Sequence, residues 1–410
     1  MGEKKVVIIG AGASGLMAAV TAARNKASVT VLEHMESAGK KLLLTGSGKC
    51  NFTNRLLLRG SGRIKEHYHG DPDLAASVIE RFDAEDCIRF FRELGVESVN
   101  RNYPYDDGVY VYPASLESRS ILRALLSECE RLSVSFVYNC HIFSVNESSD
   151  GRWGIHTDLG TFDADSLIFA VGSNAAPRTG SDSSIYPVIK SLGHGFMPFL
   201  PALCGLRPEA GAMDELKGVR AEAIVGLHVY SDNDMMLYQS RGEVQLSSEG
   251  ISGVCVMDLS GHASLSLKRG YDTVLSLRFL PWLSDEELKA YVIRQYESHP
   301  EGPLDLLSGA LPLRLSEYIM RRSGSMEQTA DLIRDLRFRI KKTADFEHSQ
   351  AARGGIPTHE IDSSTMGSKL KKGIYFCGEM VDVDGCCGGY NLQYAWSSGY
   401  VAGMAAAAMT

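Results

Sequence analysis

The sequence lacks the features that mark membrane proteins, nucleic-acid-binding proteins and disulfide-rich secreted proteins. No apolar stretch reaches the roughly 18 residues that a membrane-spanning helix requires. The 50 acidic and 42 basic side chains give a net charge of −8 without long runs of one sign, which argues against a nucleic-acid partner. The nine cysteines form an odd set without a CxxC pair, as expected of free thiols in a reducing compartment. We therefore expect a cytoplasmic protein with neither a membrane nor a nucleic-acid partner.

What the sequence does contain, at its N-terminal end, is a nucleotide-binding fingerprint. The apolar run Lys5–Ile9 is typical of a central parallel strand, and it leads directly into the glycine turn Gly10–Gly15. In this motif the first glycine allows a tight turn, the second admits a pyrophosphate and the third lets the helix pack on the strand. A second strand at 28–32 ends on Glu33, whose carboxylate can accept both hydroxyls of an adenosine ribose and would repel a 2′-phosphate. The pattern predicts a bound dinucleotide.

The next glycine-rich segment, Gly39–Asn51, superficially resembles a P-loop but lacks essential parts of that motif. The earlier glycine is missing, and Cys50 replaces the hydroxyl residue that binds Mg²⁺. Phosphoryl transfer is therefore not expected. A second complete GxGxxG motif is also absent, so a nicotinamide cofactor, if it is used, must visit the site transiently.

The C-terminal end carries another glycine-rich helix start. A strand near 374–376 leads into Gly378-Glu379, and Gly388-Gly389 precedes a helix that opens with Tyr390–Gln393. A glycine-rich helix start at both ends of the chain is typical of a flavin enzyme of the two-dinucleotide-binding type and not of a plain nicotinamide dehydrogenase. The predicted cofactor is therefore FAD.

Four segments resemble the BaiN-like (YhiN-like) family of NAD(P)/FAD-dependent oxidoreductases. They are Gly39–Asn54, the strand Leu167–Gly172 with its Pro177–Gly180 sequel, Gly250–Gly253, and Gly373–Glu379 continuing through Gly399. The resemblance covers essentially the whole chain. It implies that Gly378-Glu379 lies beside the ribityl and phosphate groups and that the backbone of Asn391–Gln393 faces the pyrimidine edge of the flavin. A helix N-terminus at that edge would stabilise the negative charge of reduced flavin.

The motifs and the resemblance together define a set of expected site residues. Tyr390, with Tyr112 as a second choice, is the candidate catalytic acid. No metal ligands are expected. The expected cofactor-binding residues are Gly10, Ala11, Gly12, Ala13, Ser14, Gly15, Glu33, His34, Lys40, Lys41, Thr45, Gly46, Gly48, Lys49, Cys50, Asn51, Ile142, Ala170, Val171, Gly172, Gly378, Glu379, Gly389, Tyr390, Asn391, Leu392 and Gln393.

Periodicity and turn residues divide the chain into an interrupted nucleotide-binding domain and an insert. We predict an α/β fold with a Rossmann-like FAD-binding domain over 1–195 and 350–410. A β-barrel-like substrate domain is predicted over 196–280 and 340–349, and a helical subdomain over 281–339. Within the insert we expect strands at 219–230, 235–239, 243–246, 254–259 and 264–279, and helices near 284–298, 312–322 and 325–339.

Three local features each admit two interpretations. His67-x-His69, with acids following, could bind a metal or belong to a polar loop before a helix. The tyrosine-rich segment 103–112 could line a pocket for a flat substrate or pack as alternate residues of a strand. Cys386-Cys387 could be a redox pair or a thiol acid beside the flavin, or two small side chains at a helix start.

These observations favour an FAD-dependent oxidoreductase with a small-molecule substrate. The first hypothesis is a reductase that takes hydride from NAD(P)H and reduces an activated, enone-type alkene. The resemblance adds a steroid-like substrate, because BaiN-like proteins are linked to reduction of unsaturated 3-oxo bile acids. The alternatives are an oxidase of a small amine or aminoketone that releases peroxide, and a non-enzymatic flavin-binding accessory protein.

Overall fold

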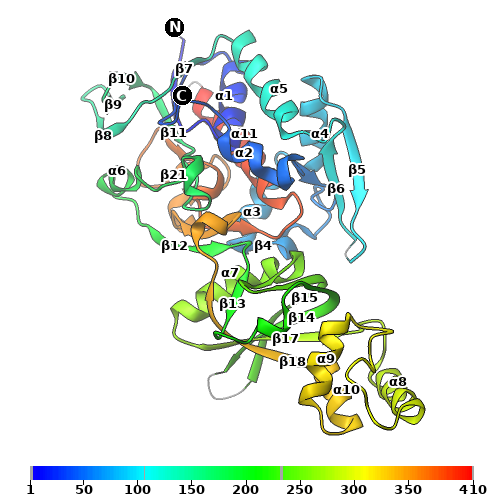
Figure 1. The fold of residues 1–410 in the computed structure, drawn as a ribbon. Coiled ribbons are helices and arrows are strands. Elements are labelled where there is room, and N and C mark those ends of the chain that lie inside the picture. Colours follow the sequence, from blue (N-terminus) through cyan, green and yellow to red (C-terminus); the bar gives the residue numbers. More distant parts are fainter. Residues whose placement is uncertain (1–2, 106, 231–233, 409–410) are drawn as a thin grey trace. The chain divides into compact units, whose positions relative to one another are not determined.

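The computed structural model describes residues 3–105, 107–230 and 234–408, and the chain divides into two compact units (Figure 1). Unit 1 consists of Met1–Phe199 and Ala351–Thr410, whereas unit 2 is the single insertion Leu200–Gln350. Residues 1–2 and 409–410, at the ends of the predicted FAD-binding domain, lie outside the described residues. The chain leaves unit 1 in β12 (Met197–Ala202) and re-enters it at β19 (Ala351–Gly355).

Unit 1 is built on a seven-stranded sheet in the order β20-β21-β22-β11-β1-β2-β7. The five strands from β22 to β7 are parallel, and β21 and β20 add an antiparallel edge. Strands β1 and β11 are almost continuously buried, as expected of parallel strands covered on both faces. The predicted Rossmann-like FAD-binding domain is confirmed. The strands are β1 (Lys5–Ile9), β2 (Ser28–Leu32), β7 (Ser135–Val137), β11 (Ser166–Phe169), β20 (Ile361–Asp362), β21 (Gly367–Ser368) and β22 (Ile374–Phe376).

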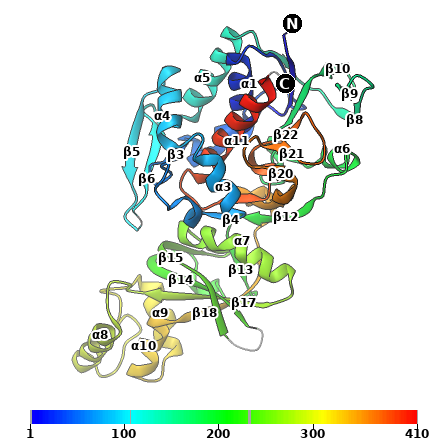
Figure 2. The same cartoon turned by 180° about the vertical axis from the view of Figure 1, so that it is seen from behind.

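The first and last helices of unit 1 pack against each other. Helix α1 (Ala13–Arg24, blue) and helix α11 (Tyr390–Ala407, red) lie side by side in both views (Figures 1 and 2). A Cβ atom on Gly399 would lie 2.3 Å from the carbonyl oxygen of Ser14, and one on Gly403 would lie 2.7 Å from that of Ala18. The two glycines therefore let the backbones approach closely, and this approach joins the two ends of the sequence.

Smaller sheets and further helices complete unit 1. The small sheets have the orders β10-β9-β8, β3-β6-β5 and β23-β4. Their strands are β3 (Thr53–Asn54), β4 (Tyr68–Gly70), β5 (Ser98–Asn102), β6 (Val109–Pro113), β8 (Ile142–Glu147), β9 (Trp153–Thr157), β10 (Gly160–Ala164) and β23 (Val383–Gly385). The helices are α2 (Lys40–Leu44), α3 (Pro72–Ile79), α4 (Ala84–Glu93), α5 (Ser118–Arg131) and α6 (Tyr186–Ser191), with 3₁₀ turns η1 (Thr45–Gly48), η2 (Ile64–His67), η3 (Pro177–Thr179), η6 (Thr358–Glu360) and η7 (Gly378–Met380).

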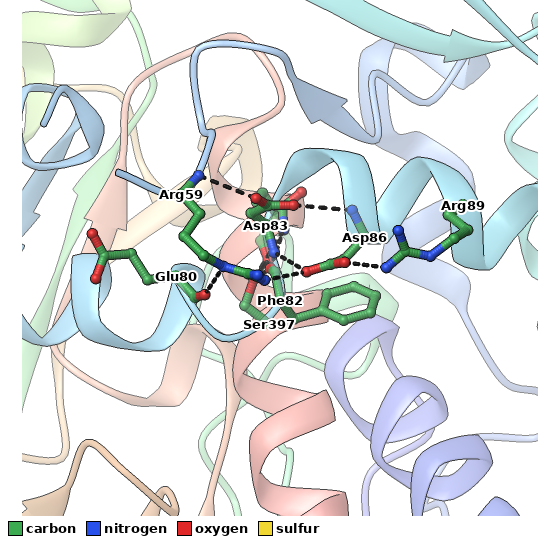
Figure 3. A network of polar contacts seen from close by, with 8 residues as sticks. Arg59, Glu80, Phe82, Asp83, Asp86, Arg89 and Ser397 are labelled. Atoms are coloured by element: carbon green, nitrogen blue, oxygen red, sulfur yellow. Dashed lines mark hydrogen bonds and ion pairs between the residues drawn. The ribbon is translucent and has the colours of Figure 1, made fainter. Parts of the chain in front are cut away.

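A polar network fixes the start of α4 against α11 (Figure 3). Asp83 and Asp86 form a reciprocal capping box at the N-terminus of α4, and Arg59 donates to Asp86 Oδ2 at 2.7 Å. The hydroxyl of Ser397, on α11, donates to the carbonyl oxygen of Phe82 at 2.6 Å. The segment before α4 is therefore tied to the C-terminal helix by buried hydrogen bonds.

Unit 2 contains a closed barrel of six strands, so the predicted barrel-like insert is confirmed. The strands are β13 (Leu206–Pro208), β14 (Val219–Tyr230), β15 (Asp234–Ser247), β16 (Gly250–Ser252), β17 (Asp272–Phe279) and β18 (Leu336–Thr343). Helices α7 (Val254–Lys268), α8 (Asp285–Ser298), α9 (Leu313–Arg322) and α10 (Met326–Arg334), with η4 (Asp214–Leu216) and η5 (Phe346–His348), accompany them. Barrel residues such as Leu227 and Leu277 share one buried core with helical residues such as Ile319.

Two expectations for the insert were wrong. The predicted strand Val254–Leu259, and the first part of the predicted strand at 264–279, belong to helix α7. Cys255, Val256, Leu259 and Ala263 are buried at helical spacing, so packing overrides the β preference of the valines. The predicted helix at 325–339 ends at Arg334, and Leu336, Phe338 and Ile340 are alternately buried in β18.

Among the helices of residues 3–105, 107–230 and 234–408, none combines the length and the apolar character needed to cross a membrane.

Candidate functional site

The predicted cofactor segments follow the carboxyl ends of neighbouring parallel strands. Gly10 follows β1, Glu33 follows β2, and Ala170 with Val171 and Gly172 follows β11, while η7 with Gly378 comes directly after β22 and Cys377. Ile142 begins β8, shortly after β7. Because the carboxyl ends of parallel strands meet at one edge of the sheet, the structure brings these segments together at the position where α/β folds bind nucleotides.

The fingerprint glycines have separable roles. Gly15 packs helix α1 on the strand, because a Cβ atom there would lie 2.0 Å from the carbonyl oxygen of Gly10. Gly12 is the N-cap of α1 with an ordinary φ of −80°, and a Cβ atom on it would meet no atom within 4 Å. The protein itself therefore does not require a glycine at position 12. The open space at Gly12, next to the amides of the helix start, fits a pyrophosphate.

Glu33 is held in place beside the fingerprint. Its side chain is buried, Oε2 accepts the N–H of Ala11 at 2.7 Å, and Oε1 accepts the N–H of Met35 at 2.8 Å. Each carboxylate oxygen can accept a further hydrogen bond, so capacity for the ribose hydroxyls remains. The ring of His34 lies next to it, with Nδ1 3.3 Å from Glu33 Oε1.

We expect Glu33→Ala to weaken FAD binding by about 1.5–3 kcal/mol, because a charge-assisted acceptor for the ribose is lost. The apoprotein should also lose thermal stability, since the amides of Ala11 and Met35 lose their acceptor. Titration of the apoprotein with FAD measures the first effect. Glu33→Gln keeps the size and one acceptor oxygen, so its affinity should lie between those of the parent and the alanine variant. An affinity within twofold of the parent for Glu33→Ala would contradict the ribose contact.

The loop after α2 is wound by successive left-handed residues. Gly46, Ser47 and Gly48 have φ values of 55°, 55° and 84°. The hydroxyl of Thr45 donates to the carbonyl oxygen of Leu42 at 2.7 Å, and Lys49 is exposed at the end of the turn. The thiol of Cys50 is fully buried, and burial raises its pKa to about 12. Cys50 therefore contributes packing and backbone to this site, and its thiol remains protonated.

An ion pair connects this loop to the C-terminal motif. Lys41 Nζ lies 2.5 Å from Glu379 Oε2, and the other oxygen of Glu379 accepts the N–H of Ala352 at 3.0 Å. Lys40 instead pairs with Glu36 at 2.6 Å. The N–H of Gly378 donates to Ser398 on α11. The two ends of the sequence thus form one continuous site.

The start of α11 offers backbone amides rather than side chains. Gly389 is the N-cap with a φ of 93°, and Leu392 is half-buried in the first turn. Asn391 folds back, with Nδ2 donating to the carbonyl oxygen of Gly385 at 2.7 Å. Gln393 is fully buried and donates to the carbonyl oxygen of Phe82 at 2.8 Å. The first-turn amides therefore fit the predicted contact with the electron-rich edge of the flavin.

The two candidate acids lie near this helix start. The hydroxyl of Tyr390 lies 3.2 Å from Asn54 Nδ2, and its ring is 3% exposed and stacks on His67 with centroids 4.5 Å apart. Tyr112, on β6, is half-buried, and burial raises the pKa of its hydroxyl. Neither geometry tests proton donation, so the two roles stay predictions.

The histidine pair at 67–69 and the tyrosine-rich segment 103–112 are far apart in the sequence, but both lie next to the segment Cys386–Gly389 in the structure. Strand β4, which contains His69, pairs with β23 just before this segment, and Cys386 Sγ lies 3.7 Å from His69 Nε2. On another side, a Cβ atom on Gly388 would lie 2.9 Å from the ring of Tyr110. Asp71, after the two histidines, caps α3 by accepting the N–H of Leu74. The histidines and tyrosines therefore form walls around the start of α11, and sequence spacing gave no sign of this convergence.

Asp384 is a buried acid that the sequence analysis did not single out. It is 3% exposed, and its Oδ1 lies 3.4 Å from Nε of Arg353. Burial, aided by Asp382 and Glu379, raises the pKa of Asp384 to about 6, although the Arg353 guanidinium opposes the shift. The sequence did contain a sign of this site: Asp382 and Asp384 stand at alternate positions of a strand-like segment, and such residues share one face.

We expect Asp384→Asn to reduce the loss of stability that the parent undergoes between pH 4 and pH 7. An unfolded aspartate ionises near pH ~3.9, so between that pH and about 6 the folded state holds the extra proton, and stability falls as pH rises. The shift of about two units corresponds to about 3 kcal/mol. Thermal unfolding of both apoproteins across this pH range measures it. Parallel curves for parent and variant would contradict the assignment.

Comparisons with known proteins agree with this geometry. The family described as HI0933-like protein Rossmann domain matches residues 4–405. The 3-dehydro-bile acid delta(4,6)-reductase of Clostridium scindens is 34% identical over 98% of this chain and 99% of that protein. The ribosomal RNA dihydrouridine synthase of Escherichia coli is 25% identical, with 96% of each chain covered. A flavocytochrome c3 fumarate reductase has a similar fold, with a TM-score of 0.52 at 13% identity over 99% of this chain and 78% of that chain.

The resemblance to BaiN-like oxidoreductases is thereby confirmed over the whole chain. The residues at the sheet edge fit FAD, since the space at Gly12 suits a pyrophosphate and Glu33 retains acceptor capacity for a ribose. The chain is thus an FAD-dependent oxidoreductase, and it belongs to the HI0933-like family of Rossmann-domain proteins.

Proposed function

We propose that the protein is an NAD(P)H-dependent reductase of carbon–carbon double bonds conjugated to a carbonyl group, with a steroid-like 3-oxo compound as substrate. The observation that carries the proposal is the 34% identity over 98% of the chain with a 3-dehydro-bile acid delta(4,6)-reductase. FAD, when bound, supplies hydride transfer to the substrate. The reductant is a nicotinamide that visits the site transiently, because the sequence has one complete dinucleotide fingerprint.

The names of the more distant relatives point to the same bond type. Conversion of uridine to dihydrouridine saturates a double bond that is conjugated to a carbonyl group, as reduction of a 3-oxo-4-ene does. The relatives therefore differ in the substrate that carries the bond rather than in the bond that is reduced. For this chain the acidic balance of −8 favours an uncharged or weakly anionic small molecule over ribosomal RNA, whose phosphates require basic surfaces.

The chain's own groups provide three parts of such a site. The backbone amides at the start of α11 form a positive end that stabilises negative charge as it develops. The buried rings of Tyr110 and Tyr390 form apolar walls beside that helix start. The partly exposed groups His67, His69 and Tyr112 can hold or transfer a proton near the same place.

Anaerobic rapid mixing tests the proposal in two stages. The FAD-loaded enzyme is first mixed with NADH, NADPH or a panel of small amines, and bleaching of the flavin absorbance is followed. The reduced enzyme is then mixed with a 3-oxo-4-ene steroid, with uridine-containing ribosomal RNA, or with oxygen. We expect a nicotinamide to reduce the flavin faster than any amine, and the steroid to reoxidise it faster than oxygen or RNA.

Other outcomes would select the alternatives. Reduction by an aminoketone but not by a nicotinamide, followed by rapid peroxide release, would replace the reductase with an oxidase. Faster reoxidation by RNA than by the steroid would show that the substrate is a nucleic acid. The reduced bond would still be a carbon–carbon double bond conjugated to a carbonyl group. No reduction by any donor would favour a flavin-binding accessory protein.

A further inference from the structure

Two of the nine cysteines lie directly before the start of the cofactor-binding helix α11. Burial raises the pKa of seven cysteines, so that these thiols stay protonated and unreactive near neutral pH. They are Cys50, Cys87, Cys129, Cys140, Cys204, Cys255 and Cys377. The remaining two, Cys386 and Cys387, lie immediately before Gly388 and Gly389 at the start of α11. These two thiols therefore lie next to the first turn of the cofactor-binding helix.

The two adjacent thiols face different partners. Cys386 continues strand β23, its N–H donates to the carbonyl oxygen of His67 at 3.0 Å, and its Sγ lies 3.7 Å from His69 Nε2. Cys387 is more exposed and interacts electrostatically with Tyr112. Strand β23 ends at Gly385 and Cys387 lies in the turn before α11, and no disulfide forms within the described part of the chain. The backbone thus presents two separate thiols and not a redox pair.

The contact between Cys386 and His69 is held firmly. Pairing of β23 with β4 sets Asp384 opposite His69 and Gly385 opposite Tyr68. The amide group of Asn391, in the first turn of α11, accepts the N–H of Gly385 at 2.9 Å and donates to its carbonyl oxygen at 2.7 Å. Cys386 is 7% exposed, whereas His69 is partly open to solvent. A proton can therefore pass from solvent through the imidazole to a shielded thiol beside the cofactor-binding helix.

Resting on the proposed function, we propose that Cys386 is the acid that protonates the α-carbon of the substrate and that His69 returns the proton to it. Hydride adds to the β-carbon, and the electron pair of the double bond moves into the carbonyl group as an enolate. The α-carbon then takes the proton of Cys386, and the S–H electron pair stays on sulfur. His69 Nε2–H reprotonates the thiolate, and the imidazole recovers a proton from solvent.

A thiol suits this role better than the two tyrosines. The ordinary pKa of a thiol, about 8.5, is lower than that of a phenol, about 10, so a thiol donates its proton to the α-carbon more readily. The hydroxyl of Tyr390 is buried beside Asn54, and burial raises the pKa of Tyr112 further. His69 gives Cys386 an imidazole partner at 3.7 Å, and an imidazole can both hold and transfer a proton.

The first test compares half-reactions of Cys386→Ala, Cys386→Ser and His69→Gln with the parent, and uses Cys129→Ala, a buried thiol on α5, as control. We expect FAD content and flavin reduction by NAD(P)H to stay within twofold in all variants. Reoxidation by a 3-oxo-4-ene steroid should slow about 100-fold in both Cys386 variants and about tenfold in His69→Gln. The pH profile of reoxidation should shift in His69→Gln, and Cys129→Ala should match the parent.

Cys386→Ser serves as the near-isosteric variant if the alanine variant loses FAD. Reoxidation within threefold of the parent in an FAD-loaded Cys386 variant overturns the acid role while leaving the reductase intact. A parent enzyme that no enone reoxidises overturns the proposed function, and the acid role falls with it. The two failures are therefore distinguishable.

The second test reads the thiol directly and does not depend on turnover. Alkylation of Cys386 by iodoacetamide at pH 7, followed by peptide mass spectrometry, measures its thiolate character in the FAD-loaded parent and in His69→Gln. We expect at least fivefold slower alkylation in the variant, and slower alkylation of Cys129 than of Cys386 in the parent. Equal rates at Cys386 in the two proteins would overturn the pairing with His69.

Discussion

Replacing Gly12 with Asp is expected to leave unit 1 folded and to weaken FAD binding by roughly 100- to 1,000-fold, about 2.7–4 kcal/mol. A Cβ atom at this position meets no protein atom within 4 Å, and the backbone has an ordinary φ, so the apoprotein can accommodate the side chain. Asp is also a favourable N-cap for α1. The new carboxylate would occupy the space that the pyrophosphate needs and would repel its charge.

The control for this change is Gly12→Asn, which has the same shape without the charge. We expect it to lose about tenfold in affinity, so that the difference between the two variants isolates the electrostatic part. Titration of the apoproteins with FAD gives the affinities, and thermal unfolding checks that both variants keep the stability of the parent. Equal affinities of the Asp and Asn variants for FAD would refute a phosphate position at the start of α1.

Gly15→Ala should act on folding rather than directly on FAD, and we expect it to destabilise the apoprotein by about 3 kcal/mol, the upper end of the usual cost of overpacking. The added Cβ atom would lie 2.0 Å from the carbonyl oxygen of Gly10 and 3.2 Å from the Cβ atom of Ala170. Since the nearest atom belongs to the backbone, helix α1 must move away from β1, and buried contacts along both elements are lost.

Thermal unfolding of the apoprotein, with hydrogen exchange of β1 and α1, measures this loss. Gly12→Ala is the matched control, because it adds the same methyl group where a Cβ atom meets no atom within 4 Å. A melting temperature for Gly15→Ala as high as that of Gly12→Ala would show that the helix and the strand can separate without cost.

The parts of the site that could be predicted are those in which sequence neighbours determine the geometry. Strand β1, the glycine turn and α1 are consecutive, so the strand, the turn and Glu33 at the end of β2 could be placed from the fingerprint. The start of α11 could be placed for the same reason, because Gly389 adopts a left-handed conformation immediately before the helix. Turns and helix starts that consecutive residues form can therefore be predicted from the sequence.

The parts that could not be predicted depend on which distant segments pair. His69 and Cys386 are 317 residues apart, and their contact exists because β4 pairs with β23. No spacing rule expresses that pairing. The error at Val254–Leu259 has a related origin, since valines with β preference form a helix where unit 2 needs one to fill its core.

The discontinuity of unit 1 has a consequence for the order of folding during synthesis. Strand β11 ends at Phe169, but its parallel neighbour β22 starts at Ile374, after the whole of Leu200–Gln350 has been made. At ribosomal rates of about 5–20 residues per second, the missing neighbour arrives on the order of 10–40 s later. Unit 2, being continuous, can fold during that interval, whereas the open edge of β11 stays exposed. Until β22 is made, this open edge is a site at which the nascent chain can pair with another chain and at which a chaperone can bind.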